Sequence, residues 1–185
     1  MNRLLMRLGA GLLLALTLSA CSMLFPPEPN RLLFGLLPTN ELGYEVDNSG
    51  TITIETRTLQ LSTRPGMPVT TVTGYRVEYY DENGALLGET SDVPQTLNIT
   101  VPAGFTCTNP DPVLGCNAMS EGARPANGVP ATVAGIQDQF LNGDIALLHQ
   151  LSGFPTGWYA DITLYYHNAF GEFEETYRAY IVVPN

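Results

Sequence analysis

Few side chains in this 185-residue sequence could carry covalent, acid–base or metal chemistry. There are three cysteines, two histidines and no lysine, which excludes a Schiff-base lysine and the lysine of a phosphate-binding P-loop. The motifs Gly-x-Ser-x-Gly and His-Glu-x-x-His are absent, and so is a glycine-rich phosphate loop. His149 falls in a possible helix and His167 beside a turn, where structural or solvated roles are expected. The sequence therefore predicts a protein with no catalytic residue, no metal site and no cofactor.

The first cysteine ends a segment with the layout of a secretory signal. A positively charged start precedes the apolar run Leu8–Leu18, which is well short of the roughly 20 residues needed to cross a bilayer. The tetrapeptide Leu18-Ser19-Ala20-Cys21 resembles the lipobox of bacterial lipoproteins. That resemblance implies that residues 1–20 are removed and that Cys21 carries a diacylglyceryl group and an acylated amine. The alternative is an ordinary secreted protein in which a cysteine falls at this place by chance.

The same resemblance predicts where the protein resides. We expect an exported chain whose acyl chains anchor it to the cell membrane or the outer membrane, with its domain in the periplasm or at the cell surface. Ser22 follows the cysteine, at the place where members kept at the inner membrane often carry aspartate, which favours the outer membrane in a two-membrane cell.

Residues 21–40 predict a tether between the anchor and the folded part. Pro26, Pro27 and Pro29 favour an extended chain that spans about 25–30 Å. The run Leu32–Leu37 is too apolar to remain in water. It is expected to dock on the domain as an edge strand, although packing on a partner or resting against lipid are alternatives.

The charge balance excludes one class of partner. The chain has 18 acidic residues against eight arginines, for a formal net charge of −10. Nucleic-acid binding requires a basic face, so we expect no nucleic-acid partner. An acidic domain is also repelled by an anionic membrane surface, so lipid has to hold the protein at the membrane.

The two remaining cysteines lie in the longest stretch without a strand pattern, residues 102–128. Export to an oxidising compartment predicts a disulfide between Cys107 and Cys116, because Cys21 is expected to be lipidated. A zinc site is the alternative, but two thiols nine positions apart with no histidine nearby are poorly spaced for it. Long loops are often functional, and here Asp111, Val113 and Leu114 are the candidate binding residues.

A second candidate surface consists of tyrosines. Tyr159, Tyr165 and Tyr180 share the outer face of the last predicted hairpin, where they could stack on sugar rings or bind a protein. The alternative is that tyrosine simply suits half-buried strands. Glu172 and Glu174 could supply a pair of carboxylates for glycoside chemistry, but an exposed charged edge is the commoner explanation.

The body of the sequence is dominated by strand and turn signals. Asp81–Gly84 predicts a tight turn in which Gly84 takes a positive φ. One short helix is predicted at 145–151, with Asp144 as its N-cap and Gly153 as its stop, and a buried strand is the alternative. Alternating runs rich in Val, Ile, Thr and Tyr predict strands at Thr51–Leu61, Val69–Tyr80, Ala85–Glu89, Thr96–Val101, Trp158–Tyr166 and Phe173–Val183.

The last two strands predict their own register. If residues 168–171 form the loop, apolar residues face one another on one side of the hairpin, and a slip of one residue would mix the two faces. Trp158 is then on the core side, and Glu175 is a charge on that side, expected near an open edge. The outer pairs expected are Asp161 with Arg178, Thr163 with Thr176, and Tyr159 with Tyr180.

These elements predict an all-β fold: a single antiparallel β-sandwich of about seven strands over residues 41–185. The segments Gly74–Tyr80 and Trp158–Val183 resemble the immunoglobulin-like and fibronectin type III-like domains of bacterial surface proteins. That resemblance implies a scaffold and no particular ligand. We therefore expect a non-enzymatic envelope lipoprotein whose domain binds or supports another envelope component. The alternative is a lipid-anchored carbohydrate-binding protein that uses the tyrosine face.

Overall fold

The computed structural model describes residues 31–89, 91, 93–112, 115–134 and 140–182. The lipobox, including Cys21, and most of the predicted tether lie outside these residues, so lipid anchoring stays a prediction. One compact unit begins at Leu32. Within the described ranges, every helix is too short or too polar to span a bilayer.

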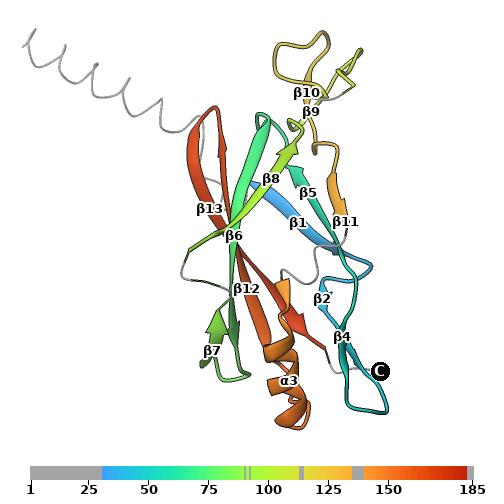
Figure 1. Ribbon diagram of the computed structural model, residues 1–185. Coiled ribbons are helices and arrows are strands. Elements are labelled where there is room, and N and C mark those ends of the chain that lie inside the picture. The colour runs from blue at the N-terminus through green and yellow to red at the C-terminus, as the bar shows by residue number, and fades with distance from the viewer. Residues whose placement is uncertain (1–30, 90, 92, 113–114, 135–139, 183–185) are drawn as a thin grey trace, which may run out of the picture. The chain divides into compact units, whose positions relative to one another are not determined.

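Two β-sheets pack against each other in this unit (Figure 1). The smaller sheet has the order β1-β5-β11, with the bounds Leu32–Leu37, Thr58–Thr63 and Ala131–Ala134. The larger sheet has the order β2-β13-β12-β6-β7, and β8 also pairs with β6. Its strands are β2 (Glu41–Leu42), β6 (Thr70–Tyr80), β7 (Leu86–Glu89), β8 (Gln95–Val101), β12 (Tyr159–Asn168) and β13 (Gly171–Ile181). The predicted all-β class and sandwich arrangement are confirmed, and among the described residues the paired strands are antiparallel except for β13 with β2.

Four short strands form two separate ribbons. One ribbon pairs β3 (Tyr44–Val46) with β4 (Ile52–Ile54). The other pairs β9 (Phe105–Thr106) with β10 (Arg124–Pro125), inside the stretch predicted to lack strands. β4 lies within the predicted strand Thr51–Leu61, whereas β3, β9 and β10 were not predicted, because strands of two or three residues are too short to show an alternating pattern.

The hydrophobic core lies between the inner faces of the two sheets. Leu61 of β5 is fully buried, as are Ile162 and Leu164 of β12. Phe140, which precedes the helix, is buried against the same cluster, and its carbonyl accepts a hydrogen bond from the Tyr79 hydroxyl at 3.2 Å. The alternation of buried and exposed residues along the long strands is therefore the one that their sequences predict.

The hairpin of β12 and β13 has the predicted register. Trp158 is 4% exposed, and its indole N–H donates to the Glu82 carboxylate at 2.8 Å. The turn at Asp81–Gly84 is also confirmed, with φ of +80° at Gly84. The paired residues include Asp161 with Arg178, Thr163 with Thr176, and Tyr159 with Tyr180.

The apolar run at the start of the described chain docks as an edge strand, the first of the three alternatives predicted for it. As β1 it pairs antiparallel with β5, with Leu32 opposite Thr63. The Leu32 N–H also donates to the Glu175 carboxylate at 3.2 Å, and the Tyr177 hydroxyl contacts that carboxylate. Burial and then Glu175 raise the pKa of Tyr177 well above its usual value. The tether predicted over residues 21–40 is therefore too long, because the folded unit already begins at Leu32.

The strand predicted at Thr51–Leu61 is interrupted. Arg57 lies between β4 and β5 and is only 7% exposed. Its guanidinium is paired with Glu55, and its Nε donates to the Glu41 carbonyl at 2.9 Å. The apolar residues change phase at this point, from Ile52 and Ile54 to Leu59 and Leu61, and the change lies where the chain leaves the β3–β4 ribbon for the other sheet.

The predicted helix is present as α3 (Gly143–Leu151). Its N-cap is Asn142, whose side chain accepts a hydrogen bond from the Ile145 N–H at 2.8 Å. The prediction of Asp144 as the cap was wrong, since Asp144 lies in the first turn, where a carboxylate interacts favourably with the helix dipole. Gly153 follows the helix with φ of +83°, which confirms the predicted stop.

Candidate functional site

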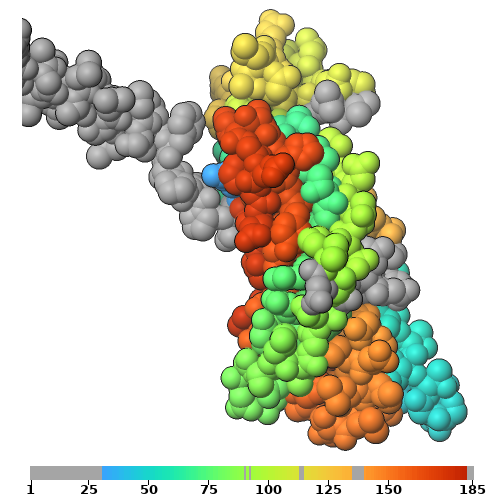
Figure 2. Space-filling view, turned by 60° about the vertical axis from the view of Figure 1, so that its left-hand side comes forward, coloured from blue at the N-terminus to red at the C-terminus, as the bar shows by residue number. Residues whose placement is uncertain are grey.

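The stretch 102–128, called the lobe below, projects beyond one end of the sandwich (Figures 1 and 2). A disulfide joins Cys107 and Cys116, with their Cα atoms 5.6 Å apart, as predicted. Within the disulfide loop, Asp111 and Gly115 exchange two backbone hydrogen bonds of 3.1 and 3.0 Å. Together with the β9–β10 ribbon, these links give the lobe a defined backbone instead of the unpatterned loop that the sequence predicted.

The base of the lobe is held tightly against the sandwich. Gly104 exchanges backbone hydrogen bonds of 2.7 and 2.8 Å with Gly66 and Met67 in the turn before β6. On the other side, the Thr63 hydroxyl donates to the Pro102 carbonyl at 2.6 Å. A Cβ atom at position 104 would lie only 1.8 Å from the Arg64 carbonyl oxygen, so glycine is required there. The lobe therefore has a fixed orientation relative to the sheets.

The outer part of the lobe is exposed to solvent. Met119 is 94% exposed, on a turn in which its N–H donates to the Asn117 side chain at 2.8 Å. Asp111, a predicted binding residue, is also exposed. Val113 and Leu114, the other two predicted there, lie outside the described residues. Met119 was not singled out from the sequence, because nothing about a lone methionine in a loop indicates its exposure.

The tyrosine face is organised around Tyr159. Its ring stacks on that of Tyr80 at 5.2 Å between centroids, and the Arg178 guanidinium carbon lies 3.7 Å from its centroid. Tyr80 and Arg178 belong to the strands on opposite sides of β12, so they cover both faces of the Tyr159 ring. Arg178 is itself held by two hydrogen bonds to Asp161, of 2.8 and 2.9 Å, which raise the pKa of Arg178.

The structure separates the three tyrosines that the sequence grouped together. Tyr180 is 51% exposed and lies edge-on to Tyr159, with 6.2 Å between ring centroids. Tyr165 is six residues farther along β12, opposite Glu174, and is partly buried. Tyr80 completes the cluster, and the sequence analysis missed it because the pairing of β6 with β12 depends on strand order, for which the sequence holds no local signal.

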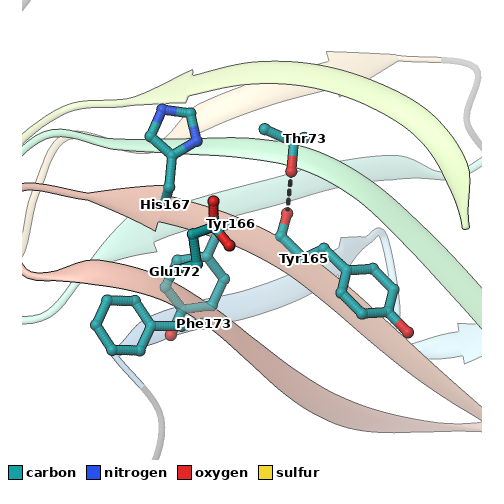
Figure 3. Close-up of a pocket in the computed structure, with 6 residues that line it drawn as sticks. All are labelled: Thr73, Tyr165, Tyr166, His167, Glu172 and Phe173. Carbon is teal, nitrogen blue, oxygen red and sulfur yellow. Dashed lines mark hydrogen bonds between the residues drawn. The ribbon is translucent and has the colours of Figure 1, made fainter.

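A shallow pocket of about 230 Å³ lies at the far end of the same hairpin. The Thr73 hydroxyl donates to the Tyr165 carbonyl at 3.2 Å, and the Tyr165 ring points away from His167 and Glu172 (Figure 3). Ligand pockets of drug-like size are usually larger and have polar groups that converge. The six residues that line it are Thr73, Tyr165, Tyr166, His167, Glu172 and Phe173.

The residues considered for other chemistry lie on the surface or in the core. Glu172 and Glu174 are both exposed on the outer face of β13, as expected for a charged edge. His149 is fully buried and hydrogen-bonded on both ring nitrogens. Among the described residues, no three His, Cys, Asp or Glu side chains cluster in a way that could hold a metal ion.

Comparison with known proteins adds no assignment: no protein-family model matches this chain, and none of the curated proteins has a sequence that matches it. The fold and the surfaces described above are therefore what a functional proposal can rest on.

Proposed function

We propose that this protein is a non-enzymatic cell-envelope lipoprotein whose sandwich domain uses the lobe to bind another envelope component. The observation that carries the proposal is the construction of the lobe, which is exposed at Met119 yet fixed by the disulfide and by the hydrogen bonds at its base. Ordering a loop before it binds lowers the entropy lost on binding. Loops held by a rigid scaffold are also the usual place for recognition.

The path of the chain supports a partner close to the membrane that carries the anchor. Leu32 pairs with Thr63, and Thr63 is hydrogen-bonded to Pro102 and Gly128 at the base of the lobe. The chain therefore joins the sandwich beside the lobe. At the rise of a polyproline II chain, the number of residues from Cys21 to Arg31 would allow a span of about 30 Å, so the proposed anchor would limit how far this end of the domain can lie from the lipid.

Carbohydrate binding by the tyrosine face is the weaker candidate. A sugar ring stacks on an open aromatic face, but both faces of Tyr159 are covered by Tyr80 and Arg178. Tyr180 alone offers a largely exposed ring in this cluster. A glycan array with the purified domain tests this alternative directly.

The proposed function can be tested by photo-cross-linking in intact cells. A photo-reactive residue at position 119 should give a specific cross-linked product, and the same residue at position 180 should not. In a Cys107→Ser/Cys116→Ser variant the product at position 119 should weaken severalfold while the domain remains folded by circular dichroism. Products that form only from position 180 would reject the lobe in favour of the strand face.

A further inference from the structure

The outward side of the helix α3 carries three exposed leucines. Ile145, Ala146 and His149 face the core and are buried. Leu147, Leu148 and Leu151 point outward and are 44%, 39% and 75% exposed. A soluble surface helix normally has a polar outer stripe, whereas Asp144 is the one charged residue of α3. The three outer leucines are called the leucine face below.

The leucine face is one continuous patch. Leu147 and Leu151 are four residues apart, and Leu148 and Leu151 are three apart, so their side chains are neighbours on the helix surface. Residues scattered singly on a surface need no explanation, but clustered exposed apolar side chains mark interaction sites.

The helix that carries these leucines is firmly positioned. Its N-terminus is capped by Asn142, and His149 on its inner side is hydrogen-bonded to the Tyr44 hydroxyl at 2.7 Å. The second ring nitrogen of His149 contacts the Pro155 carbonyl at 2.8 Å. The three leucines are therefore exposed although α3 is packed firmly against the rest of the domain.

The charged residues of α3 and of two segments at its end of the sandwich all have one sign. Asp144 lies on the helix, Asp81 and Glu82 lie in the turn between β6 and β7, and Glu45 and Asp47 lie on the β3–β4 ribbon. These segments occupy the same end of the sandwich as α3, opposite the lobe (Figure 1). Residues 44–54, 81–84 and 143–151 contain no arginine or lysine, so every charged side chain of these three segments is acidic, and together these side chains are called the acidic rim below.

We propose that the leucine face is the docking site for an amphipathic helix of a second protein, one with an apolar face flanked by Lys or Arg residues. Its apolar face would cover the three leucines, and its basic flanks would meet the acidic rim. A second copy of this chain fits poorly, because it would bring two acidic rims together. A lipid surface also fits poorly, since the acidic rim is repelled by anionic headgroups.

The test uses the full mature chain with Cys21→Ser, so that neither detergent nor lipid competes. Two labelled synthetic peptides of equal length form amphipathic helices with the same apolar face. One peptide has lysine at the polar positions and the other has glutamate. Fluorescence anisotropy should show saturable binding of the lysine peptide. The affinity for the glutamate peptide should be lower by roughly tenfold or more. Added salt should weaken the binding of the lysine peptide.

The variant Leu148→Gln/Leu151→Gln should reduce binding of the lysine peptide at least tenfold, whereas the matched control Tyr180→Gln should leave it unchanged. Circular dichroism must show that all variants are folded. If the double variant is not folded, the single variant Leu151→Gln replaces it in the binding experiment. Equal binding of both peptides, or binding that survives loss of the leucines, would overturn the proposal. Leucine-dependent dimerisation in sedimentation, or binding to anionic or zwitterionic vesicles in place of the peptide, would overturn it in favour of the other occupants.

Discussion

The Tyr44 hydroxyl and the His149 ring form a buried hydrogen bond of 2.7 Å that joins the β3–β4 ribbon to the helix α3. Because the other ring nitrogen of His149 donates to the Pro155 carbonyl, Nδ1 accepts the proton of the tyrosine hydroxyl. Both residues are fully buried. This pair therefore holds α3 at the end of the sandwich where the leucine face lies. Loss of the hydrogen bond should lower the free energy of unfolding.

The first prediction concerns the variant Tyr44→Phe. It leaves the His149 Nδ1 buried without a donor, which should lower the free energy of unfolding by about 1–3 kcal/mol. Urea unfolding at neutral pH measures this loss. The variant His149→Phe removes both polar groups of the ring and leaves Tyr44 unpaired, so it should be destabilised as well. A wild-type stability for Tyr44→Phe would contradict the buried hydrogen bond.

The second prediction is a pH dependence that follows from the same residue. Burial raises the pKa of Tyr44 to about 12 from an ordinary value near 10. The folded state therefore holds the phenol proton more tightly than the unfolded state does. The stabilisation that this contributes is complete below about pH 10 and is lost as the pH rises from 10 to 12. Between pH 8 and pH 11, the free energy of unfolding measured in urea should fall less for Tyr44→Phe than for the wild type.

The third prediction compares the two faces of the β12–β13 hairpin. Asp161 and Arg178 form a surface ion pair, so Asp161→Ala should lower the free energy of unfolding by at most about 1 kcal/mol. Trp158 is buried, so Trp158→Ala should lower the free energy of unfolding by about 3–5 kcal/mol. Chemical denaturation of the two variants measures both losses of stability. Equal losses would mean that Trp158 is not on the core face of the hairpin and Asp161 is not on its outer face.

The sequence predicted most where two neighbouring strands constrain each other. In the β12–β13 hairpin, charge pairs, threonine pairs and aromatic pairs agree on one register, and the structure has it. The turn at Asp81–Gly84 was predictable from its local residue types, and the disulfide from the two cysteines that remain besides Cys21. Side-chain chemistry within a short stretch of chain was enough for these features.

What the sequence did not predict is which of several suitable residues or segments the fold uses. Arg57 lies within a predicted strand, but in the structure it lies between two strands, buried and bound to Glu41 and Glu55. Asn142 caps the helix although Asp144 is an equally good capping residue by type. The leucine face was hidden for a related reason, since α3 has apolar residues on both its covered and its outward side, and its sequence does not show which side the sheets cover.

The fourth prediction tests the anchor. Cys21→Ser should abolish lipid labelling, because the thiol is the proposed acceptor of the diacylglyceryl group, and it should leave either uncleaved precursor or soluble protein. Metabolic labelling with a fatty acid and fractionation in high salt measure both effects. A variant that is still lipidated and remains with the membrane at the wild-type level would reject the lipoprotein proposal.

The last prediction concerns the docking of the lobe onto the sandwich. In Gly104→Ala, the added methyl group would lie 1.8 Å from the Arg64 carbonyl oxygen, a backbone atom that cannot swing aside. The lobe base must then move, which should lower the free energy of unfolding by at least about 2 kcal/mol.

Gly143→Ala is the matched control, because no atom lies within 4 Å of the added Cβ atom and alanine is a better helix former than glycine. Its stability should equal or slightly exceed that of the wild type in thermal and urea unfolding. Gly104→Ala should also weaken the cross-linked product from position 119, since that product depends on a fixed lobe, whereas Gly143→Ala should not. If both variants unfold like the wild type, the lobe is not docked as described, and the case for a pre-ordered binding surface fails with it.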